Sequence, residues 1–204
     1  MESFDRKAFE LLVALTSREN GLKPIEAIYR IVDELLSETI KRGDIHLACS
    51  EGCTHCCHQL VAASDVEWQL IEKYIAEMPV EDRSILLKKM KDGYTRWQDY
   101  LSSLPDSRRQ SSRQNTELML EDWYGTYPCP FLNESSCGIY SVRPLLCRAF
   151  TSTSKCTSTN NSECVQFRFD FMRFAMDMVF DLQDGKKTII HPLIHRCGSI
   201  LTII

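Results

Sequence analysis

Soft metal-binding side chains crowd one stretch of this chain, Cys49-Ser50-Glu51-Gly52-Cys53-Thr54-His55-Cys56-Cys57-His58, which holds four cysteines and two histidines in ten residues. A second set of cysteines follows far downstream in three short blocks, Cys129-Pro130-Phe131-Leu132, Cys137-Gly138-Ile139-Tyr140 and Arg143-Pro144-Leu145-Leu146-Cys147-Arg148. Structural zinc and iron-sulfur sites are built from separate groups of thiolates such as these. The two sets therefore predict that the chain folds around bound metal.

The compartment decides how these cysteines are interpreted. The 204 residues, 44% hydrophobic and 25% charged, have the composition of a soluble globular protein. No run approaches the roughly 20 apolar residues of a membrane span, and residues 1–7 mix acids with bases without a cleavage signature behind them. We therefore expect a cytoplasmic protein. Because reducing thiol pools keep cytoplasmic cysteines unpaired, metal ligation or redox catalysis is the expected use of the ten cysteines, with disulfides the lesser alternative.

The net charge of −4 provides no field that would attract nucleic acid or an anionic membrane surface, so neither is an expected partner. The one local basic patch, Arg108, Arg109 and Arg113 among serine and glutamine, is interpreted as a solvated helix face or linker. Nothing in the pattern identifies a protein partner or a substrate.

Apolar spacing predicts a mostly α-helical protein, and we expect residues 1–204 to form a single domain. Residues 1–43 indicate a helical hairpin, with one helix over residues 4–17 that stops at Gly21 and a second from Pro24 to just before Gly43. The residues expected to face inward in the first helix are Phe4, Ala8, Leu11, Leu12 and Leu15. Those in the second are Ile25, Ile28, Val32, Leu35, Leu36 and Thr39.

Further helices are expected beyond the first cysteine stretch. Ser64-Asp65-Val66-Glu67 is a capping box that opens a helix to about Met78, with Val66, Leu70 and Tyr74 inward. Pro79 opens another, and a more polar helix is expected from Pro105-Asp106 to about Trp123. A C-terminal helix over about residues 163–183 carries two apolar faces, which predicts a central helix that packs on the cysteine core. The inward residues expected after Pro79 are Leu86, Met90, Gly93 or Tyr94, Trp97, Leu101 and Leu104.

Residues 125–161 differ in composition from the predicted helices. They contain prolines, a Ser/Thr-rich stretch and five cysteines in or near them, and they show little periodic apolar pattern. A long loop without structure of its own is uncommon in a compact domain. We therefore expect metal to order an irregular, cysteine-rich core that spans residues 49–150.

The candidate metal ligands are the seven cysteines of the two sets. The short spacing Cys53-x2-Cys56 lets two thiolates reach one ion, and Cys49 adds a third donor. Cys56 and Cys57 are adjacent, so their side chains leave the backbone in different directions, and either one is a bystander or the site holds a cluster or two ions. The candidates are Cys49, Cys53, Cys56, Cys57, Cys129, Cys137 and Cys147.

Other donors are left open by the pattern. Cys156 or Cys164 would supply an eighth thiolate, whereas Cys197 is interpreted as a buried small hydrophobic residue. His55 and His58 are either alternative ligands or exposed neighbours of the metal loop. The pair His191 and His195 is interpreted as a chance spacing.

Arg143 and Arg148 flank the last strong cysteine. Their guanidinium groups would offset the negative charge of a buried thiolate site, or would hold an anionic substrate against the metal. The sequence contains no nucleophile elbow, no phosphate loop and no zinc-protease helix motif, which leaves the question of catalysis open.

Taken together, Cys49-x3-Cys53-x2-Cys56-Cys57, Cys129-Pro-Phe-Leu, Cys137-x-Ile-Tyr and Arg143-Pro-x2-Cys147-Arg148 resemble the YkgJ-type cysteine-cluster family, also described as the zinc- or iron-chelating CxxCxxCC domain. The resemblance covers roughly residues 49–150 and implies metal binding through the matching cysteines, with the metal left open. Related domains occur in flagellin lysine methylases, in which an iron-sulfur cluster is implicated. Nothing in this chain matches a separate methyl-donor site, so that activity is not carried over.

The expected cofactor is an iron-sulfur cluster or zinc, and the surplus of thiolates over what one zinc ion needs favours the cluster. The first hypothesis is a metal-binding protein of unknown physiological role. The alternatives are an enzyme that uses an iron-sulfur centre for redox or group-transfer chemistry, and a zinc-stabilised interaction scaffold. An open coordination position beside a pocket would favour the enzyme, and a closed four-sulfur shell would favour the scaffold.

Overall fold

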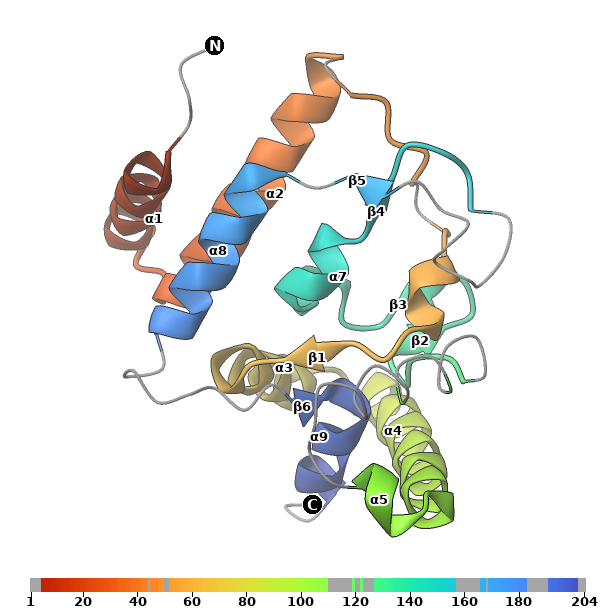
Figure 1. Cartoon of the computed structure of the whole chain (residues 1–204). Helices are drawn as coiled ribbons and strands as arrows, with labels where there is room; N and C mark the ends of the chain where they lie inside the picture. The colour runs from red at the N-terminus through yellow and green to blue at the C-terminus, as the bar shows by residue number, and fades with distance from the viewer. Residues whose placement is uncertain are drawn as a thin grey trace.

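The computed structural model describes residues 5–43, 45–49, 52–109, 119, 122, 127–156, 166, 167, 169–182 and 191–201. The fold is mostly helical, as predicted, and its strands are short two-residue pairs. Helices gather in two groups, one at the upper left of the view and one in its lower half, with the cysteine-rich segments beside them (Figure 1). None of the described helices is both long enough and apolar enough to cross a membrane.

The first group begins with α1 (Arg6–Asn20) and α2 (Pro24–Lys41), which pack against each other as the predicted hairpin requires. Asp5 caps α1 by accepting a hydrogen bond from the Ala8 amide at 2.8 Å, and Gly21 ends the helix with a φ of 63°, a left-handed conformation that glycine adopts without strain. Pro24 opens α2 at the position where a missing N–H is harmless.

The predicted inward face of α1 is wrong. Phe9 and Val13 are the buried residues of this helix, whereas Leu11, Leu12 and Leu15 are exposed and Phe4 lies outside the described residues. Both sides of α1 carry apolar residues, so helical periodicity alone could not select the side that faces the core. In α2 the predicted Ile25, Ile28 and Val32 are buried, and Leu35 and Leu36 pack partly against the same core.

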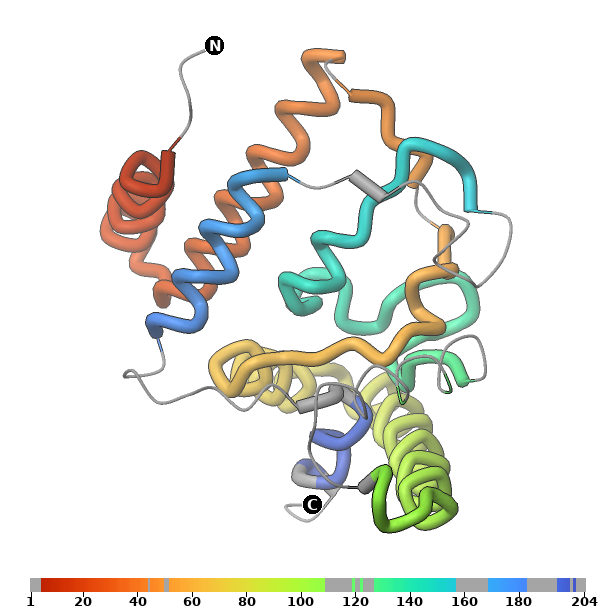
Figure 2. Tube along the Cα trace, viewed as in Figure 1, coloured from red at the N-terminus to blue at the C-terminus, as the bar shows by residue number. Residues whose placement is uncertain are grey.

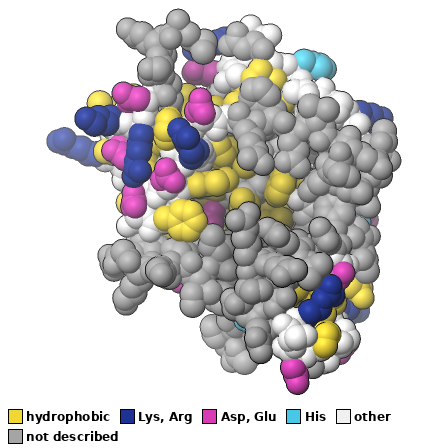
Figure 3. All heavy atoms as spheres, viewed as in Figure 1, with side chains coloured by type: hydrophobic (Ala, Val, Ile, Leu, Met, Phe, Trp, Pro, Cys, Tyr) yellow, Lys and Arg dark blue, Asp and Glu magenta, His cyan; other side chains and the backbone are white. Residues whose placement is uncertain are grey.

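Helix α8 (Asp170–Asp181) completes the first group and lies beside α2 (Figure 1). It buries Phe171, Met172, Phe174, Ala175 and Val179 against α1 and α2. Arg6 of α1 forms ion pairs with Asp177 and Asp181 of α8, and side chains of both charges mix over this side of the surface (Figure 3). The predicted start of this helix at 163 is wrong, because residues 166 and 167 form strand β5 (Gln166–Phe167).

The second group contains α3 (Asp65–Glu77), α4 (Val80–Ser103), the short α5 (Asp106–Arg109) and α9 (Leu193–Leu201). The predicted face of α4 is confirmed in Leu86, Met90, Gly93 and Trp97, which are buried, whereas Leu101 is half-buried and the buried Leu104 follows the helix. In α3 the predicted inward residues Val66 and Leu70 are only partly buried, and they pack against the first group of helices. The fully buried apolar residues of α3 are Trp68, Ile71 and Ile75. Most of the polar helix expected to reach Trp123 lies outside the described residues.

The C-terminal segment forms a helix that the sequence did not predict. Its β-favouring residues, Ile200 and Leu201 among them, lie in α9, which packs along α4. Just before it, β6 (His191–Pro192) pairs antiparallel with β1 (Ala62–Ala63). This pairing attaches the end of the chain to the segment that follows the first cysteine stretch.

The cysteine-rich segments carry short elements rather than long ones. η1 (His55–His58) is a single 3₁₀ turn, and β2 (Leu132–Asn133) forms a tight hairpin with β3 (Ser136–Cys137). After η2 (Tyr140–Val142) and α7 (Leu145–Ala149), β4 (Thr151–Ser152) pairs with β5. The trace shows residues 45–49 running beside the segment that contains β4, where the Ala48 amide donates to the Ser152 carbonyl at 2.8 Å (Figure 2).

Replacing Gly198 of α9 by alanine is expected to destabilise the protein by about 2 kcal/mol, because a Cβ atom at this position would lie 2.5 Å from Cζ of Tyr94 on α4. Helix propensity alone predicts the opposite sign, a gain of about 1 kcal/mol. Urea denaturation of Gly198→Ala measures the difference. In a Tyr94→Ala background the same substitution should become neutral or stabilising, and a loss of equal size there would contradict the packing explanation.

Candidate metal centre

The two predicted sets of cysteines meet at η1. This turn holds Cys56 and Cys57 in its middle, and the Cys57 amide donates to the Thr54 carbonyl at 2.9 Å. The backbone amide of Cys129 donates to the carbonyl of Cys57 at 2.6 Å. This bond places the start of the second set directly against the end of the first.

Four thiols from four different elements lie close enough to influence one another. They come from η1, from the turn before β2, from β3 and from α7. For each pair of these cysteines, the negative charge of one thiolate would raise the pKa of the other thiol. We call these residues the four-thiol group. They are Cys56, Cys129, Cys137 and Cys147.

Burial is the main cause that keeps most of this group protonated. It raises the pKa of Cys129 to about 12 and raises the pKa of Cys147 well above the ordinary value. The pKa of Cys56 is raised first by a side-chain hydrogen bond with Cys57 and then by burial. Arg143 acts in the opposite sense, since its positive charge lowers the pKa of Cys56, Cys137 and Cys147.

Backbone amides already point at two of these sulfurs. The amide of Phe131 hydrogen-bonds to the Cys129 sulfur and that of Ile139 to the Cys137 sulfur, and both bonds lower the pKa of the thiol that accepts them. Each donor lies two residues after its cysteine, so the same local turn recurs in two separate blocks. Hydrogen bonds to sulfur stabilise metal-bound thiolates, and this donor set therefore suits a soft metal or cluster.

A second group of cysteines, here called the outer group, consists of Cys49, Cys53 and Cys156. Cys49 interacts with Cys53 and Cys156, and its sulfur accepts a hydrogen bond from the Ser152 amide at 3.2 Å. The three cysteines line one pocket of about 530 Å³. Cys49 also lies within electrostatic reach of Cys56, so this outer group adjoins the four-thiol group.

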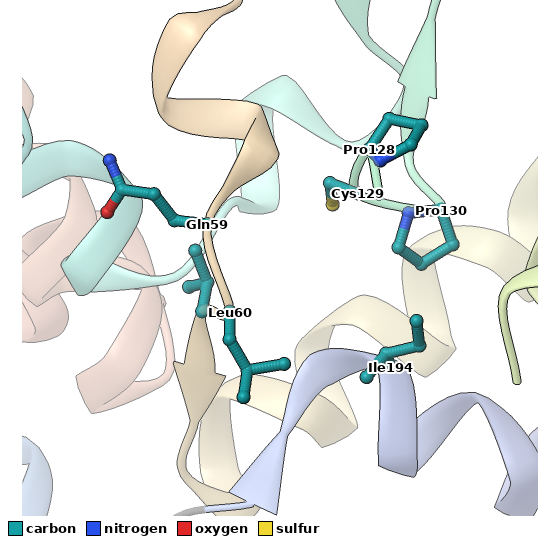
Figure 4. Close-up of a pocket in the computed structure, with 7 residues that line it drawn as sticks. Gln59, Leu60, Pro128, Cys129, Pro130 and Ile194 are labelled. Carbon is teal, nitrogen blue, oxygen red and sulfur yellow. The ribbon is translucent and has the colours of Figure 1, made fainter. Parts of the chain in front are cut away.

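The cavity beside the four-thiol group is much smaller. It has a volume of about 10 Å³, and Cys129 lies at its wall between Pro128 and Pro130, opposite Leu60 and above Ile194 of α9 (Figure 4). A cavity of this size holds at most about one water molecule. The four-thiol group is therefore closed on this side to any substrate.

The remaining candidates are placed as follows. His55 and His58 have buried Nδ1 atoms without a hydrogen-bond partner. Cys197 is fully buried in the core between α3, α4 and α9, as expected for a small hydrophobic residue, and lies near Cys129. His195 is exposed on α9, and Cys164 lies outside the described residues.

Within the described ranges, no three histidine, cysteine, aspartate or glutamate side chains stand in a geometry that could hold a metal ion. Thiolates bind zinc at about 2.3 Å, so the four sulfurs must turn further toward a common point to share one ion. The thiols lie together in their protonated form, and ligation would replace their protons with metal.

A comparison of the chain with models of protein families identifies the family to which these cysteines belong. The family model described as CxxCxxCC, a "putative zinc- or iron-chelating domain", matches residues 48–165. The chain belongs to the CxxCxxCC family. Neither the curated proteins nor the solved structures contain a match to this chain.

Membership of the CxxCxxCC family confirms the predicted resemblance and supports metal binding. The matched region is longer than the expected core of residues 49–150, because it extends past β4 and includes both Cys156 and Cys164. All seven predicted ligands and both groups of cysteines lie within the CxxCxxCC domain. The sequence pattern leaves the role of Cys156 open, since no spacing rule connects it to Cys49, more than 100 residues earlier.

Alkylation of the metal-free CxxCxxCC domain is expected to separate the cysteines by burial. At pH 8, Cys49, which is exposed, should react with iodoacetamide at least about tenfold faster than Cys129 and Cys147, because only thiolates react and burial raises the pKa of those two thiols further than that of Cys49. Peptide mass spectrometry over a time course measures the individual rates. Equal rates for Cys49 and Cys129 would contradict the burial seen here.

Proposed function

We propose that this chain is a metal-binding protein whose four-thiol group, Cys56, Cys129, Cys137 and Cys147, holds an iron-sulfur cluster, with zinc as the alternative occupant. The single observation that carries this proposal is that four thiols from four separate elements lie within electrostatic reach of one another. An iron-sulfur cluster bound there would supply one-electron redox chemistry. The protein's own residues would set the environment of the cluster.

Those residues supply charge and hydrogen bonds. Four thiolates bring four negative charges, more than one zinc ion or a typical oxidised cluster neutralises. Arg143 lies near three of the four cysteines, and Arg148 lies near Cys137. Together with the amides of Phe131 and Ile139, these two arginines would stabilise the thiolate form.

The role of the centre is proposed from the space around it. The cavity of about 10 Å³ beside Cys129 leaves no room for a substrate at that sulfur, which favours electron transfer or a structural role over catalysis there. A zinc-stabilised scaffold is the second candidate, and the same closed surroundings favour it. The surplus of thiolates in the chain supports the cluster over zinc.

Removal of one ligand tests the proposal. Cys137→Ala is expected to lose most of the iron or zinc that the unaltered chain retains, because three thiolates hold a four-coordinate centre poorly. Metal per chain is measured by plasma mass spectrometry after anaerobic purification. The matched control is Cys197→Ala, which removes a buried cysteine from the same core and should leave the metal content unchanged. Equal metal content in Cys137→Ala and the unaltered chain would refute the four-thiol centre.

A further inference from the structure

Helix α1 carries four exposed side chains in one line along its outer surface. Residues four apart on a helix lie in such a line, or ridge. The buried residues of the helix, Phe9 and Val13, lie on the opposite side, because each residue turns the helix by about 100°. Leu11 is 60% exposed and Leu15 is 43% exposed. We call this line the α1 ridge, and it consists of Lys7, Leu11, Leu15 and Glu19.

The described part of the chain leaves the α1 ridge uncovered. The other side of α1 packs against α2 and α8, and α1 lies at the outer edge of the molecule (Figure 1). Among the described residues, the two charged members of the ridge have no ion-pair or hydrogen-bond partner. Leu11 and Leu15, with the exposed Leu12 beside them, belong to the apolar face that the sequence pattern predicts to be buried. Adjoining exposed leucines indicate a surface that another molecule covers.

The charges at the two ends of the ridge identify that molecule. The ridge begins with a positive charge at Lys7 and ends with a negative charge at Glu19, with the two leucines between them. In two copies of α1 that lie antiparallel about a twofold axis between Leu11 and Leu15, Lys7 of each copy faces Glu19 of the other. Leu11 then faces Leu15. The ridge is therefore complementary to itself, as a twofold interface between identical chains requires. Parallel copies would place like charges against each other.

We propose that the α1 ridge is an interaction surface for a second copy of this chain, in which the two α1 helices pack antiparallel in a homodimer. Interlocking ridges of residues four apart are the commonest form of helix packing in globular proteins. One helix face offers less than the area of about 800 Å² that each partner contributes to a stable interface, so the dimer is weak, with a dissociation constant on the order of 10–100 µM. The interface contains no cysteine, so it does not depend on the proposed metal centre.

Exchange of the two charges tests the antiparallel register. Sedimentation velocity of the full-length chain, purified without oxygen and kept reduced, measures the dissociation constant. Lys7→Glu should weaken the dimer by at least about tenfold, because each of the two ion pairs becomes a pair of facing glutamates. Glu19→Lys should weaken it by a similar factor. Both variants should fold, since the helix dipole favours an acid near the start of α1 and a base near its end.

Combining the two changes should restore the dimer. The double variant Lys7→Glu/Glu19→Lys has the same opposite charges in reverse order, so its dissociation constant should return to that of the unaltered chain. An equimolar mixture of the two single variants should form a heterodimer, because the acids of one then face the bases of the other. Single variants that dimerise as tightly as the unaltered chain would overturn the antiparallel interface.

A leucine variant tests the apolar part of the ridge. Leu11→Ser should also weaken the dimer by at least about tenfold, because the twofold axis removes two leucines from the interface. The matched control is Ile85→Ser, which removes another exposed apolar side chain, 55% exposed on α4, and should leave the dissociation constant unchanged. An unaltered chain that stays monomeric at about 500 µM would overturn the proposal. A monomer that instead binds phospholipid vesicles through Leu11 would also overturn it and assign the ridge to a membrane surface.

Discussion

Replacement of Arg148 by methionine is expected to lower the free energy of unfolding by about 3 kcal/mol, a large part of the 5–15 kcal/mol typical of a domain. Arg148 is only 1% exposed although it carries a charge. Its guanidinium group donates to both carboxylate oxygens of Asp33 on α2, and it also donates to the carbonyls of Ser141 at 2.7 Å and Arg143 at 3.0 Å. Methionine has a similar length but provides none of these donors.

The position of Arg148 explains the size of the effect. It lies on α7 directly after Cys147, and its guanidinium group lies over the ring of Tyr29 on α2, 4.2 Å from the ring centre. The substitution therefore separates the N-terminal hairpin from the segment that carries a proposed ligand. Because the Asp33 side chain is half-exposed, water can solvate it after the change, and this places the expected loss at the lower end for a broken buried pair.

Urea denaturation of the metal-free protein measures the loss without a contribution from bound metal. The matched control is Arg30→Met on the same α2 helix, where Arg30 pairs with Glu34 at the surface. That pair should contribute less than about 0.5 kcal/mol. A loss below 1 kcal/mol for Arg148→Met would contradict the interpretation that this arginine joins the hairpin to the cysteine-rich segment.

Replacement of Glu67 by alanine is expected to cost about 3 kcal/mol as well. The Glu67 side chain is 5% exposed and accepts from the Leu145 amide at 2.8 Å, the Ser64 amide at 2.8 Å and the Tyr29 hydroxyl at 3.1 Å. Alanine would leave these donors buried without an acceptor, and each such donor costs about 1–3 kcal/mol before any relaxation. The loss would appear as a lower urea midpoint with an unchanged denaturant slope.

Two companion variants separate the parts of the Glu67 effect. Ser64→Ala removes only the capping hydroxyl of α3 and should cost about 1 kcal/mol. Glu67→Gln keeps one acceptor but turns an amide N–H₂ group toward the donors, and it should fall between the other two. If Glu67→Ala were no worse than Ser64→Ala, the carboxylate would serve only as a helix cap and would not join α2, α3 and α7.

The starts of helices were predicted best where the sequence contains a capping residue or a proline at the first turn. The capping box at Ser64 and Glu67, the proline that opens α2 and the proline before α4 all lie where expected. The inward faces of α1 and α3 were wrong, because each helix has apolar residues on more than one side and long-range packing selects among them. The start of α8 was wrong because residues 166 and 167 pair with β4, a contact far away in the sequence.

The candidate site shows the same division. The two cysteine sets and their family could be predicted, since spacing and neighbouring residue types carry that signal. The grouping of the thiols could not be predicted. Cys56 lies with the later cysteines, whereas Cys49 and Cys53 lie with Cys156, and this division depends on the turn at Gly52 and on the contact with β4. The buried roles of Glu67 and Arg148 depend on partners in α2 and were also invisible to spacing rules.

The most direct test of the four-thiol centre is the iron, zinc and acid-labile sulfide content per chain after purification without oxygen, with the visible absorption recorded on the same sample. We expect a brown protein with iron and sulfide in comparable amounts, or, for the alternative occupant, a colourless protein with zinc bound per chain. A colourless protein that contains neither metal, and whose fold is unchanged in the Cys129→Ala/Cys147→Ala variant, would contradict the claim that these cysteines bind metal.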